Sequence, residues 1–258
     1  MAKLIVRHLK KTYSDDNGSN LVLDDVSFEV AEGEFVSILG PSGCGKTTLL
    51  KIIAGLLQPD SGEVLIDNVP VSSGQKQVGY IFQQESLFPW RTVRKNIEFG
   101  LEVSGVRASE RRALTEEMIE LIRMRGQEDK YPHQISGGQA RKVEMARSLI
   151  TSPDVLVSDE GFSNLDAQTR NYLQVEFLRI WQETMSTILF VTHNVDEAVF
   201  MSDRILILSN TPARIIGEFR VDLQRPRDRA STGCLEYRAR ILEMLRVEQE
   251  KALLKRGL

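Results

Sequence analysis

The chain has 258 residues, 41% of them hydrophobic and 27% charged, which is ordinary for a globular protein and excludes the disordered and fibrous classes. Its 33 Lys and Arg residues against 36 Asp and Glu residues give a net charge of −3, so the broad basic surface of a nucleic-acid-binding protein is not expected. No apolar run approaches the roughly 20 residues that span a bilayer, and the N-terminal stretch is too poor in apolar residues for a signal peptide. We therefore expect a cytoplasmic protein with no nucleic-acid partner.

The pattern of apolar residues predicts strands that alternate with helices along the chain. Period-two alternation at 3–9 and 22–30 indicates antiparallel strands, whereas compact apolar runs at 34–40, 154–160 and 187–193 are typical of strands buried in a parallel sheet. Helical spacing of apolar residues occurs at 47–57, 109–124, 137–150, 166–182 and 234–256. A strand followed by a glycine loop and a helix favours a right-handed α/β arrangement.

Residues 40–47 read GPSGCGKT and form the strongest chemical signal in the sequence. They follow an apolar run and open the helix predicted at 47–57, which is the context that a phosphate-binding loop requires. In such a loop the glycines let the backbone wrap the phosphates, Lys46 neutralises the β- and γ-phosphates, and the Thr47 hydroxyl ligates Mg²⁺. The complete spacing disfavours the alternative, a chance glycine turn before a helix.

This loop and the element pattern together predict an α/β fold with a P-loop NTPase core. The core has a mostly parallel sheet, an N-terminal antiparallel β part and an inserted helical lobe. We expect a single domain over 1–258, with the nucleotide-binding core at 1–90 and 151–220 and the helical lobe at 91–150. Residues 221–258 form a C-terminal extension.

A phosphate loop needs a carboxylate for the metal ion and a group that positions water. The run DVLVSDE at 154–160 supplies both: Asp159 can hold Mg²⁺ through water, and Glu160 can act as general base. The alternative is that these carboxylates only cap the next helix. His193 ends an apolar strand where strand ends gather around a ligand, which favours a contact to the γ-phosphate over a purely structural role.

A second glycine-rich turn, ISGGQ, occupies residues 135–139. Two adjacent glycines and a serine can donate hydrogen bonds to an anion, but one nucleotide should not need two such cradles. Either the stretch is only a loop before the helix predicted at 137–150, or it binds a phosphate that belongs to another molecule.

The ordered set of motifs resembles the ATP-binding subunit of ABC transporters, and the resemblance extends from about Leu4 to Ser209. The set comprises the phosphate loop, Gln83 in IFQQ, ISGGQ, VLVSDE, SNLD at 163–166 and VTH ending at His193. It implies that two ATPase subunits pack head to tail as a homodimer that binds ATP and Mg²⁺, and that a monomer is nearly inactive. The residues that would cap the γ-phosphate held by the other chain are Ser136, Gly137, Gly138 and Gln139.

The resemblance assigns further roles to single residues, each with a structural alternative. Tyr13 is expected to stack on adenine, or else to lie at the edge of the core. Gln83 is expected to reach Mg²⁺ and the attacking water, and Asp166 to link the two subunits or to cap the following helix. The remaining nucleotide-binding positions are the phosphate loop and the residue after it: Gly40, Pro41, Ser42, Gly43, Cys44, Gly45, Lys46, Thr47 and Thr48.

Three features need separate expectations. Gly161 stands where the family usually carries proline, so Glu160 is expected to be less restrained and activity to be lower. Ala140 and Lys142 stand where arginine and glutamine are more usual, a change expected to affect mainly surface charge. Cys44 either has a lowered thiol pKa and reacts with alkylating agents, or is buried and inert.

Within the family, the stretches at 82–97, 189–209 and 221–231 look like the importer ATPases of the nitrate, sulfonate and taurine group. That group works on the cytoplasmic face of the membrane with integral membrane permease subunits and, indirectly, an extracytoplasmic solute-binding protein. The apolar cluster at 87–90, which includes Phe88 and Trp90, either receives a short permease helix or anchors the helical lobe. The alternative function is a soluble ABC ATPase without a membrane partner.

Overall fold

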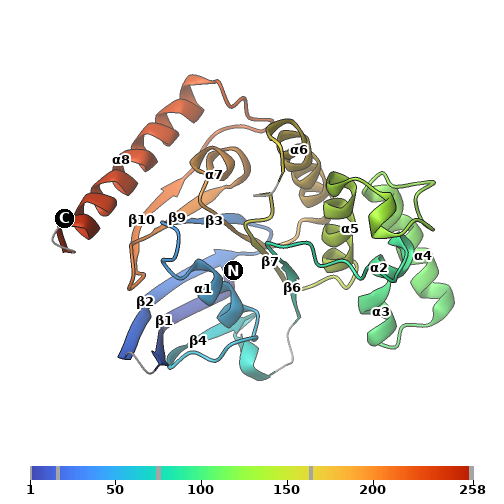
Figure 1. Cartoon of the computed structure of the whole chain (residues 1–258), viewed down its shortest axis with the longest axis horizontal. Coiled ribbons are helices and arrows are strands. Elements are labelled where there is room, and N and C mark those ends of the chain that lie inside the picture. The colour runs from blue at the N-terminus through green and yellow to red at the C-terminus, as the bar shows by residue number, and fades with distance from the viewer. Residues whose placement is uncertain (1, 16–17, 74–76, 163–164, 256–258) are drawn as a thin grey trace.

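The computed structural model describes residues 2–15, 18–73, 77–162 and 165–255, which form two sheets flanked by helices (Figure 1). One sheet is antiparallel and has the order β2-β1-β4-β5. Its strands are β1 (Ala2–Asp15), β2 (Gly18–Ala31), β4 (Ser61–Ile66) and β5 (Val69–Pro70). The first two confirm the antiparallel strands predicted at 3–9 and 22–30. The other two escaped prediction because they are short and only half of β4 is buried.

The second sheet has six strands in the order β10-β9-β3-β8-β7-β6. The pairs from β9 to β6 are parallel, whereas β10 pairs antiparallel with β9. Its strands are β3 (Phe35–Leu39), β6 (Val78–Ile81), β7 (Val155–Asp159), β8 (Ile188–Thr192), β9 (Arg204–Leu208) and β10 (Ile215–Arg220). Every residue of β3, β7 and β8 is buried, which explains their continuous apolar sequences and confirms the predicted parallel strands.

Helices cover both faces of the six-stranded sheet (Figure 1). Helix α1 (Lys46–Ile53) lies between the two sheets, and its apolar residues share one core with both of them. Helix α6 (Ala167–Thr184) packs on the other face, while α7 (Val195–Met201) and α8 (Thr232–Lys255) form a third apolar cluster with β9 and β10. Among the described residues, none of the helices combines the length and apolarity needed to cross a bilayer.

Residues 91–150 are all described and contain helices but no strand. They form α2 (Val93–Ile97), α3 (Phe99–Val103), α4 (Ala108–Leu121), the 3₁₀ turn η2 (Pro132–Gln134) and α5 (Gly137–Leu149). The fully buried Asn96 fixes the entry to this segment, because its amide donates to the carbonyl oxygens of Phe88, Arg91 and Thr92 at 3.0–3.1 Å. The predicted helical content is present, and the boundaries of the lobe at 90 and 150 stay a prediction.

Phe35, the first residue of β3, lies at the centre of an aromatic cluster. Its ring centroid is 5.6–6.0 Å from those of Phe177, Trp181 and Phe190, and the side chain is fully buried. Replacing Phe35 by Ala should lower the free energy of unfolding by about 3–5 kcal/mol, because it removes buried area and leaves a cavity. Guanidinium unfolding measures this loss. The matched change Val175→Ala, at an exposed position of α6, should cost less than about 0.5 kcal/mol. Equal losses for the two variants would show that Phe35 is not a core residue.

Candidate active site

The candidate site lies where β3, β7 and β8 end. In the parallel pairing Leu39 faces Thr192 and Asp159 faces Val191, so the residues that follow each strand emerge at one edge of the sheet. The phosphate loop follows β3, Glu160 follows β7 and His193 follows β8. The sheet therefore brings the phosphate loop at 40–47 together with Glu160 and His193, which follow it by more than a hundred residues in the sequence.

The phosphate loop needs glycine at two positions. Gly43 and Gly45 have φ angles of 77° and 111°, in the region that favours glycine, and a Cβ on Gly45 would lie 2.8 Å from Val22 Cγ1. Gly45 is the N-cap of α1, so the unpaired N–H groups of that helix begin directly after the loop. Lys46 is buried, and its Nζ donates to the carbonyl oxygens of Gly40 at 2.8 Å and Pro41 at 2.9 Å. The ammonium group is thus held inside the loop.

A cavity of about 440 Å³ opens over this loop. Residues of three of the predicted motifs meet in it: Val22, Ser42, Gly43, Gly45, Lys46, Thr47, Thr48, Gln83 and Glu160. Tyr13 lies at its margin, because its hydroxyl is 3.5 Å from Thr48 Oγ1 while 45% of the residue surface is exposed. The exposed ring favours the adenine-stacking role over the alternative of a core-edge residue.

Glu160 occupies the centre of the polar groups at this edge. One carboxylate oxygen lies 3.0 Å from His193 Nδ1, and the other accepts a hydrogen bond from Gln83 Nε2 at 3.1 Å. Its backbone N–H donates to Val191 O at 2.9 Å, and its φ of 47° is unusual for a residue other than glycine. The structure therefore brings the predicted base, the predicted water-positioning amide and the strand-end histidine into direct contact.

Asp159 and Thr47 supply oxygen atoms next to Glu160. The Tyr80 hydroxyl donates to Asp159 Oδ2 at 3.4 Å, and the Thr47 side chain lies close enough to that carboxyl to lower its pKa. Burial raises the pKa of Asp159, and the side chains of Thr47 and Tyr80 oppose that rise. A carboxylate, a hydroxyl and the nearby amide of Gln83 are the hard oxygen donors that suit Mg²⁺ bound together with nucleotide phosphates. The donor set fits the predicted metal ion.

Gly161 is tightly packed in the turn that carries Glu160. A Cβ at this position would lie 2.7 Å from Ser158 Oγ and 2.9 Å from Arg141 Nη2. The glycine therefore makes room for the Arg141 guanidinium, and the side chain of Glu160 is restrained by Gln83 and His193. The sequence contains no sign of this neighbour from α5, and the lower activity expected from glycine in place of proline stays a prediction.

Arg141 belongs to a buried ionic cluster that sequence reasoning missed. Its Nη1 donates to Glu144 Oε2 at 2.5 Å and to the carbonyl oxygen of Phe82, directly before Gln83, at 2.8 Å. Glu144 accepts hydrogen bonds from the N–H and hydroxyl groups of Ser86, and Arg147 Nη1 donates to Ser86 O at 2.8 Å. The cluster ties the segment that carries Gln83 to α5. The sequence did contain a signal for this cluster: Arg141, Glu144 and Arg147 recur every three residues, on one face of the helix predicted at 137–150.

The position of Lys142 differs from the one expected from the sequence. The residue is only 6% exposed, so the prediction that its change from the usual pattern affects surface charge is wrong. Its Nζ donates to the Tyr172 hydroxyl at 3.1 Å, lies 3.7 Å from Glu176 Oε2 and 5.0 Å from the centroid of the Tyr172 ring. Ala140 is also buried. Both residues thus contribute to the packing of α5.

The ISGGQ stretch forms the start of α5. Ser136 is the N-cap: its Oγ accepts from the N–H of Gln139 at 3.3 Å, and Gln139 Oε1 accepts from the N–H of Ser136 at 2.9 Å. The turn is exposed at Ser136 and Gly137, and the residues that line the 440 Å³ cavity include none from 135–139. The exposed N-terminus of α5 thus remains available to a phosphate outside its own chain.

Asp166 is the N-cap of α6. Its Oδ1 accepts from the backbone N–H groups of Gln168 at 3.1 Å and Thr169 at 3.0 Å, and these bonds hold the pKa of the carboxyl below its usual value. The capping alternative is therefore correct, and the intersubunit role stays a prediction. The first two residues of SNLD, Ser163 and Asn164, lie outside the described residues.

Of the two alternatives for Cys44, a reactive thiol or a buried and inert one, the structure supports the second. Its side chain is almost fully buried, and burial raises the pKa of the thiol despite the nearby Lys46. The lowered pKa suggested by the helix N-terminus is wrong, because desolvation of the thiolate outweighs the attraction of the ammonium group.

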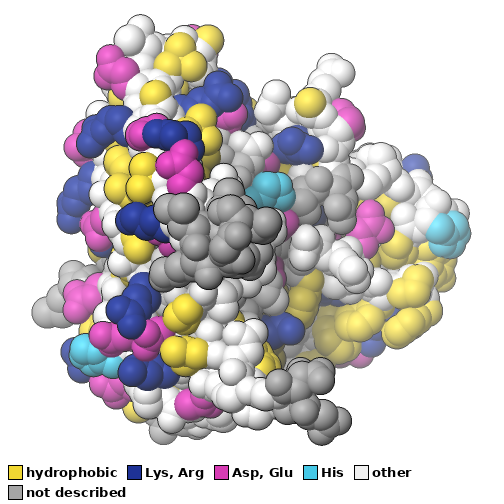
Figure 2. Space-filling model, turned by 60° about the vertical axis from the view of Figure 1, so that its left-hand side comes forward, with side chains coloured by type: hydrophobic (Ala, Val, Ile, Leu, Met, Phe, Trp, Pro, Cys, Tyr) yellow, Lys and Arg dark blue, Asp and Glu magenta, His cyan; other side chains and the backbone are white. Residues whose placement is uncertain are grey.

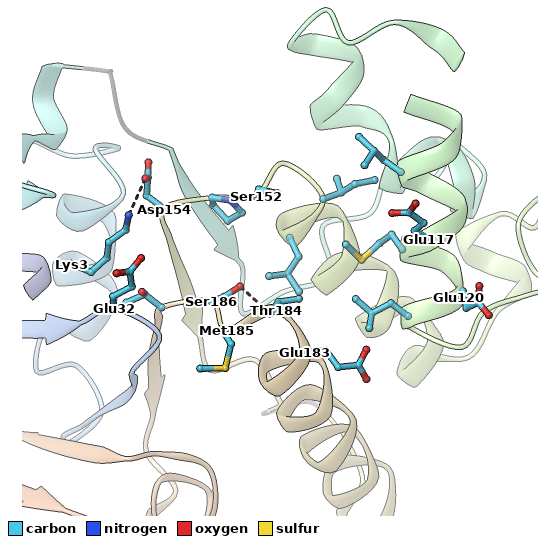
Figure 3. Close-up of a pocket in the computed structure, with 17 residues that line it drawn as sticks. Lys3, Glu32, Glu117, Glu120, Ser152, Asp154, Glu183, Thr184, Met185 and Ser186 are labelled. Atoms are coloured by element: carbon cyan, nitrogen blue, oxygen red, sulfur yellow. Dashed lines mark hydrogen bonds and ion pairs between the residues drawn. The ribbon is translucent and has the colours of Figure 1, made fainter. Parts of the chain in front are cut away.

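A larger cavity, of about 680 Å³, opens at the opposite edge of the sheet (Figure 3). Its labelled acidic residues come from the turn before β3, from α4, from the residue before β7 and from α6, and Lys3 is already paired with Asp154 at 3.3 Å. These carboxylates repel phosphate, and none of the described residues that line the cavity belongs to a predicted nucleotide-binding motif except Asp154, which is paired with Lys3. The labelled acidic residues are Glu32, Glu117, Glu120, Asp154 and Glu183.

Comparisons with known proteins agree with this geometry. The ABC transporter family matches residues 23–163. An uncharacterized ABC transporter ATP-binding protein of Methanocaldococcus jannaschii is 48% identical over 251 residues, which cover 97% of this chain and 94% of that protein. The aliphatic sulfonates import ATP-binding protein SsuB of Bacillus cereus is 40% identical over 238 residues, which cover 92% of this chain and 94% of that protein.

Solved structures share the fold. A dimeric ATP-binding cassette in a post-hydrolysis state, bound to ADP and Pi, is 29% identical, with a TM-score of 0.73 and coverage of 86% of this chain and 100% of that chain. The protein cbiO1 from Clostridium perfringens, part of the ABC transporter complex cbiONQ, is 26% identical, with a TM-score of 0.75 and coverage of 85% and 89%. The predicted α/β fold class is confirmed.

Gly161→Ala tests the packing of the catalytic turn. Because the new Cβ would collide with Ser158 Oγ and Arg141 Nη2, we expect the turn to shift and the kcat of ATP hydrolysis to fall by about 10- to 100-fold while ATP still binds. Steady-state phosphate release measures the effect. The double variant Gly161→Ala, Ser158→Ala removes one of the two obstacles and should recover part of the activity. A single variant with unchanged kcat would show that the turn has space for a side chain.

Proposed function

We propose that this chain, which belongs to the ABC transporter family of ATP-binding subunits and is an ATPase, powers uptake of a small solute through a membrane importer. The observation that carries the ATPase assignment is the contact of Glu160 with Gln83 and His193 above the phosphate loop. The importer assignment is supported by the 40% identity to the sulfonate import protein SsuB. Nitrate, an alkanesulfonate or taurine is the proposed class of solute.

In the proposed reaction each group at the sheet edge has one task. Lys46 and the N–H groups at the start of α1 bind the β- and γ-phosphates of ATP, and Tyr13 stacks on adenine. Glu160 accepts a proton from the attacking water, which the Gln83 amide orients, while His193 donates to the γ-phosphate. Asp159, Thr47 and Gln83 would hold Mg²⁺, which neutralises charge on the phosphate oxygens when it is bound.

A second copy of the chain completes the site in this proposal. Ser136, Gly137 and Gly138 begin α5, a helix of thirteen residues whose N-terminus favours an anion. Placed against the phosphate loop of a partner chain, these N–H groups would bind the γ-phosphate from the other side. ATP then bridges both subunits, and hydrolysis removes the bridge.

The proposed contact with the permease lies at the start of the helical segment. Phe88 packs on Phe99 with ring centroids 4.7 Å apart, whereas 71% of the surface of Trp90 is exposed. Each of the two expected roles of the cluster at 87–90 thus fits a different residue. Phe88 anchors the helical segment, and Trp90 offers an apolar surface to a partner helix. Figure 2 shows apolar side chains gathered at the right-hand end of the molecule, while acidic and basic side chains are interspersed elsewhere on that face.

The second candidate function is a soluble ABC ATPase without a membrane partner. It would use the same nucleotide chemistry, but it gives no role to the exposed indole of Trp90 beside the segment that carries Gln83. The importer proposal places the protein on the cytoplasmic face of the membrane, with permease subunits in direct contact and a solute-binding protein outside.

Glu160→Gln tests the catalytic and dimer roles together. Loss of the general base should lower ATP hydrolysis by about 100- to 10,000-fold without loss of ATP binding, because the amide keeps the size of the carboxylate. The variant should then accumulate as an ATP-bound dimer in size-exclusion chromatography. A second variant that also carries Lys46→Ala should stay monomeric. A Glu160→Gln protein that remains monomeric in saturating ATP would contradict the shared-site proposal.

Purification of the tagged chain from detergent-solubilised membranes, followed by mass spectrometry, tests the membrane partner. We expect one integral membrane protein to co-purify with the wild type and to be depleted with Trp90→Ala. Because Trp90 is exposed, the isolated variant should keep its ATPase activity, which serves as the control. Recovery of soluble partners alone would favour the second candidate function.

A further inference from the structure

The loop between β9 and β10 reaches the phosphate loop. Thr211 Oγ1 donates a hydrogen bond to the carbonyl oxygen of Gly43 at 3.1 Å. At the opposite edge of the same peptide unit, the N–H of Cys44 donates to Pro41 O at 3.3 Å. Because a peptide unit is planar, these two bonds together fix the orientation of the peptide between Gly43 and Cys44. Gly43 also lines the cavity over the loop.

Helix α8 holds this β9–β10 loop from outside. Glu248 Oε1 accepts from the backbone N–H of Asn210 at 3.1 Å, and Asn210 Nδ2 donates to the carbonyl oxygen of Glu248 at 3.1 Å. The helix itself is anchored by the buried side chains of Cys234 and Ile241 in the cluster with α7, β9 and β10. The contact therefore connects the C-terminal extension with the residue next to Thr211.

The antiparallel sheet holds the other end of the loop. The N–H of Ala213 donates to Val22 O at 2.8 Å, and the N–H of Asp24 donates to Ala213 O at 3.0 Å. Arg214 forms an ion pair with Asp24. With Glu248 on one side and β2 on the other, Thr211 is presented to Gly43 by a loop that is fixed at both ends.

We propose that Thr211 is a positioning residue for the phosphate loop and that α8 adjusts the affinity for ATP through Glu248, Asn210 and Thr211. The chain of contacts gives the C-terminal extension a role beyond packing: a partner or modification that moves the end of α8 changes nucleotide binding. The proposal rests on the nucleotide site and is independent of the transported solute and of the permease.

Thr211→Val tests the contact to the phosphate loop, because valine keeps the shape of threonine and removes the hydroxyl donor. Loss of one neutral hydrogen bond should raise the Kd for ATP, and the KM of hydrolysis, by about 2- to 10-fold with little change in kcat. Thr211→Ser keeps the hydroxyl and should bind ATP as the wild type does. Titration with a fluorescent ATP analogue and steady-state kinetics give the three values. An unchanged Kd for Thr211→Val, with or without a lower Tm, would overturn the proposal.

Glu248→Ala tests the connection to α8, with Glu248→Gln as the control that retains the acceptor oxygen. We expect the alanine variant to raise the Kd for ATP in the same direction as Thr211→Val and the glutamine variant to leave it unchanged. If Glu248 acts through Thr211, the double variant Thr211→Val, Glu248→Ala should bind ATP no more weakly than Thr211→Val alone. Additive losses would show that α8 affects the site by another route, and an unaffected Kd in Glu248→Ala would show that it does not affect the site at all. Loss of solute uptake with unchanged ATP affinities would concern the transport proposal alone.

Discussion

The in-register parallel pairing of β3, β8 and β7 is the constraint on which the site depends. Asp159 lies beside Val191 and Leu39 beside Thr192, so the loops that follow the three strands begin at the same level. The backbone bond from Glu160 N–H to Val191 O continues this pairing by one residue and places the carboxylate next to His193. A slip of one residue in β7 would turn the side chain of each of its residues to the face of the sheet opposite its present one. Asp159 and Glu160 would then no longer lie next to the phosphate loop.

Secondary structure and site motifs were predictable from the sequence where the local residue pattern agrees with the tertiary environment. Strands buried on both faces are mostly apolar, and the phosphate loop combines glycines with a helix start, so β3, β7, β8 and α1 were predictable from their own residues. The site motifs were recognisable for the same reason: their chemistry depends on residue types at short spacing. Strand β5 and helices α2 and α3 have five residues or fewer, which is too short for a periodic pattern.

The wrong expectations concern residues whose environment is made by distant segments. Cys44 has a cation nearby in sequence, but the core around α1 buries its thiol and decides the direction of its pKa. Lys142 has the sequence character of a surface residue, but Tyr172 and Glu176 of α6 cover it and bind its ammonium group. Gly161 is surrounded more closely than its sequence suggests, because Arg141 of α5 occupies the space beside it, and the lower activity expected from glycine at this position stays a prediction. In each case a contact over many residues of sequence overrides the local preference.

The buried charges of α5 explain how two functions of this helix are joined. Burying Arg141 and Glu144 is costly unless they are paired and hydrogen-bonded. The two residues pair with each other and bind the segment 82–86 on either side of Gln83, although Nε and Nη2 of Arg141 have no hydrogen-bond partner among the described residues. The same helix begins at Ser136. A displacement of the Gln83 segment, which continues into Phe88 and Trp90, must therefore either move α5 or break a buried ion-pair network. Leaving such charges buried and unpaired costs on the order of 3–5 kcal/mol, so the network favours joint movement of the segment and the helix. The segment proposed to meet the permease and the helix N-terminus proposed to meet the partner's nucleotide are thus parts of one mechanical unit.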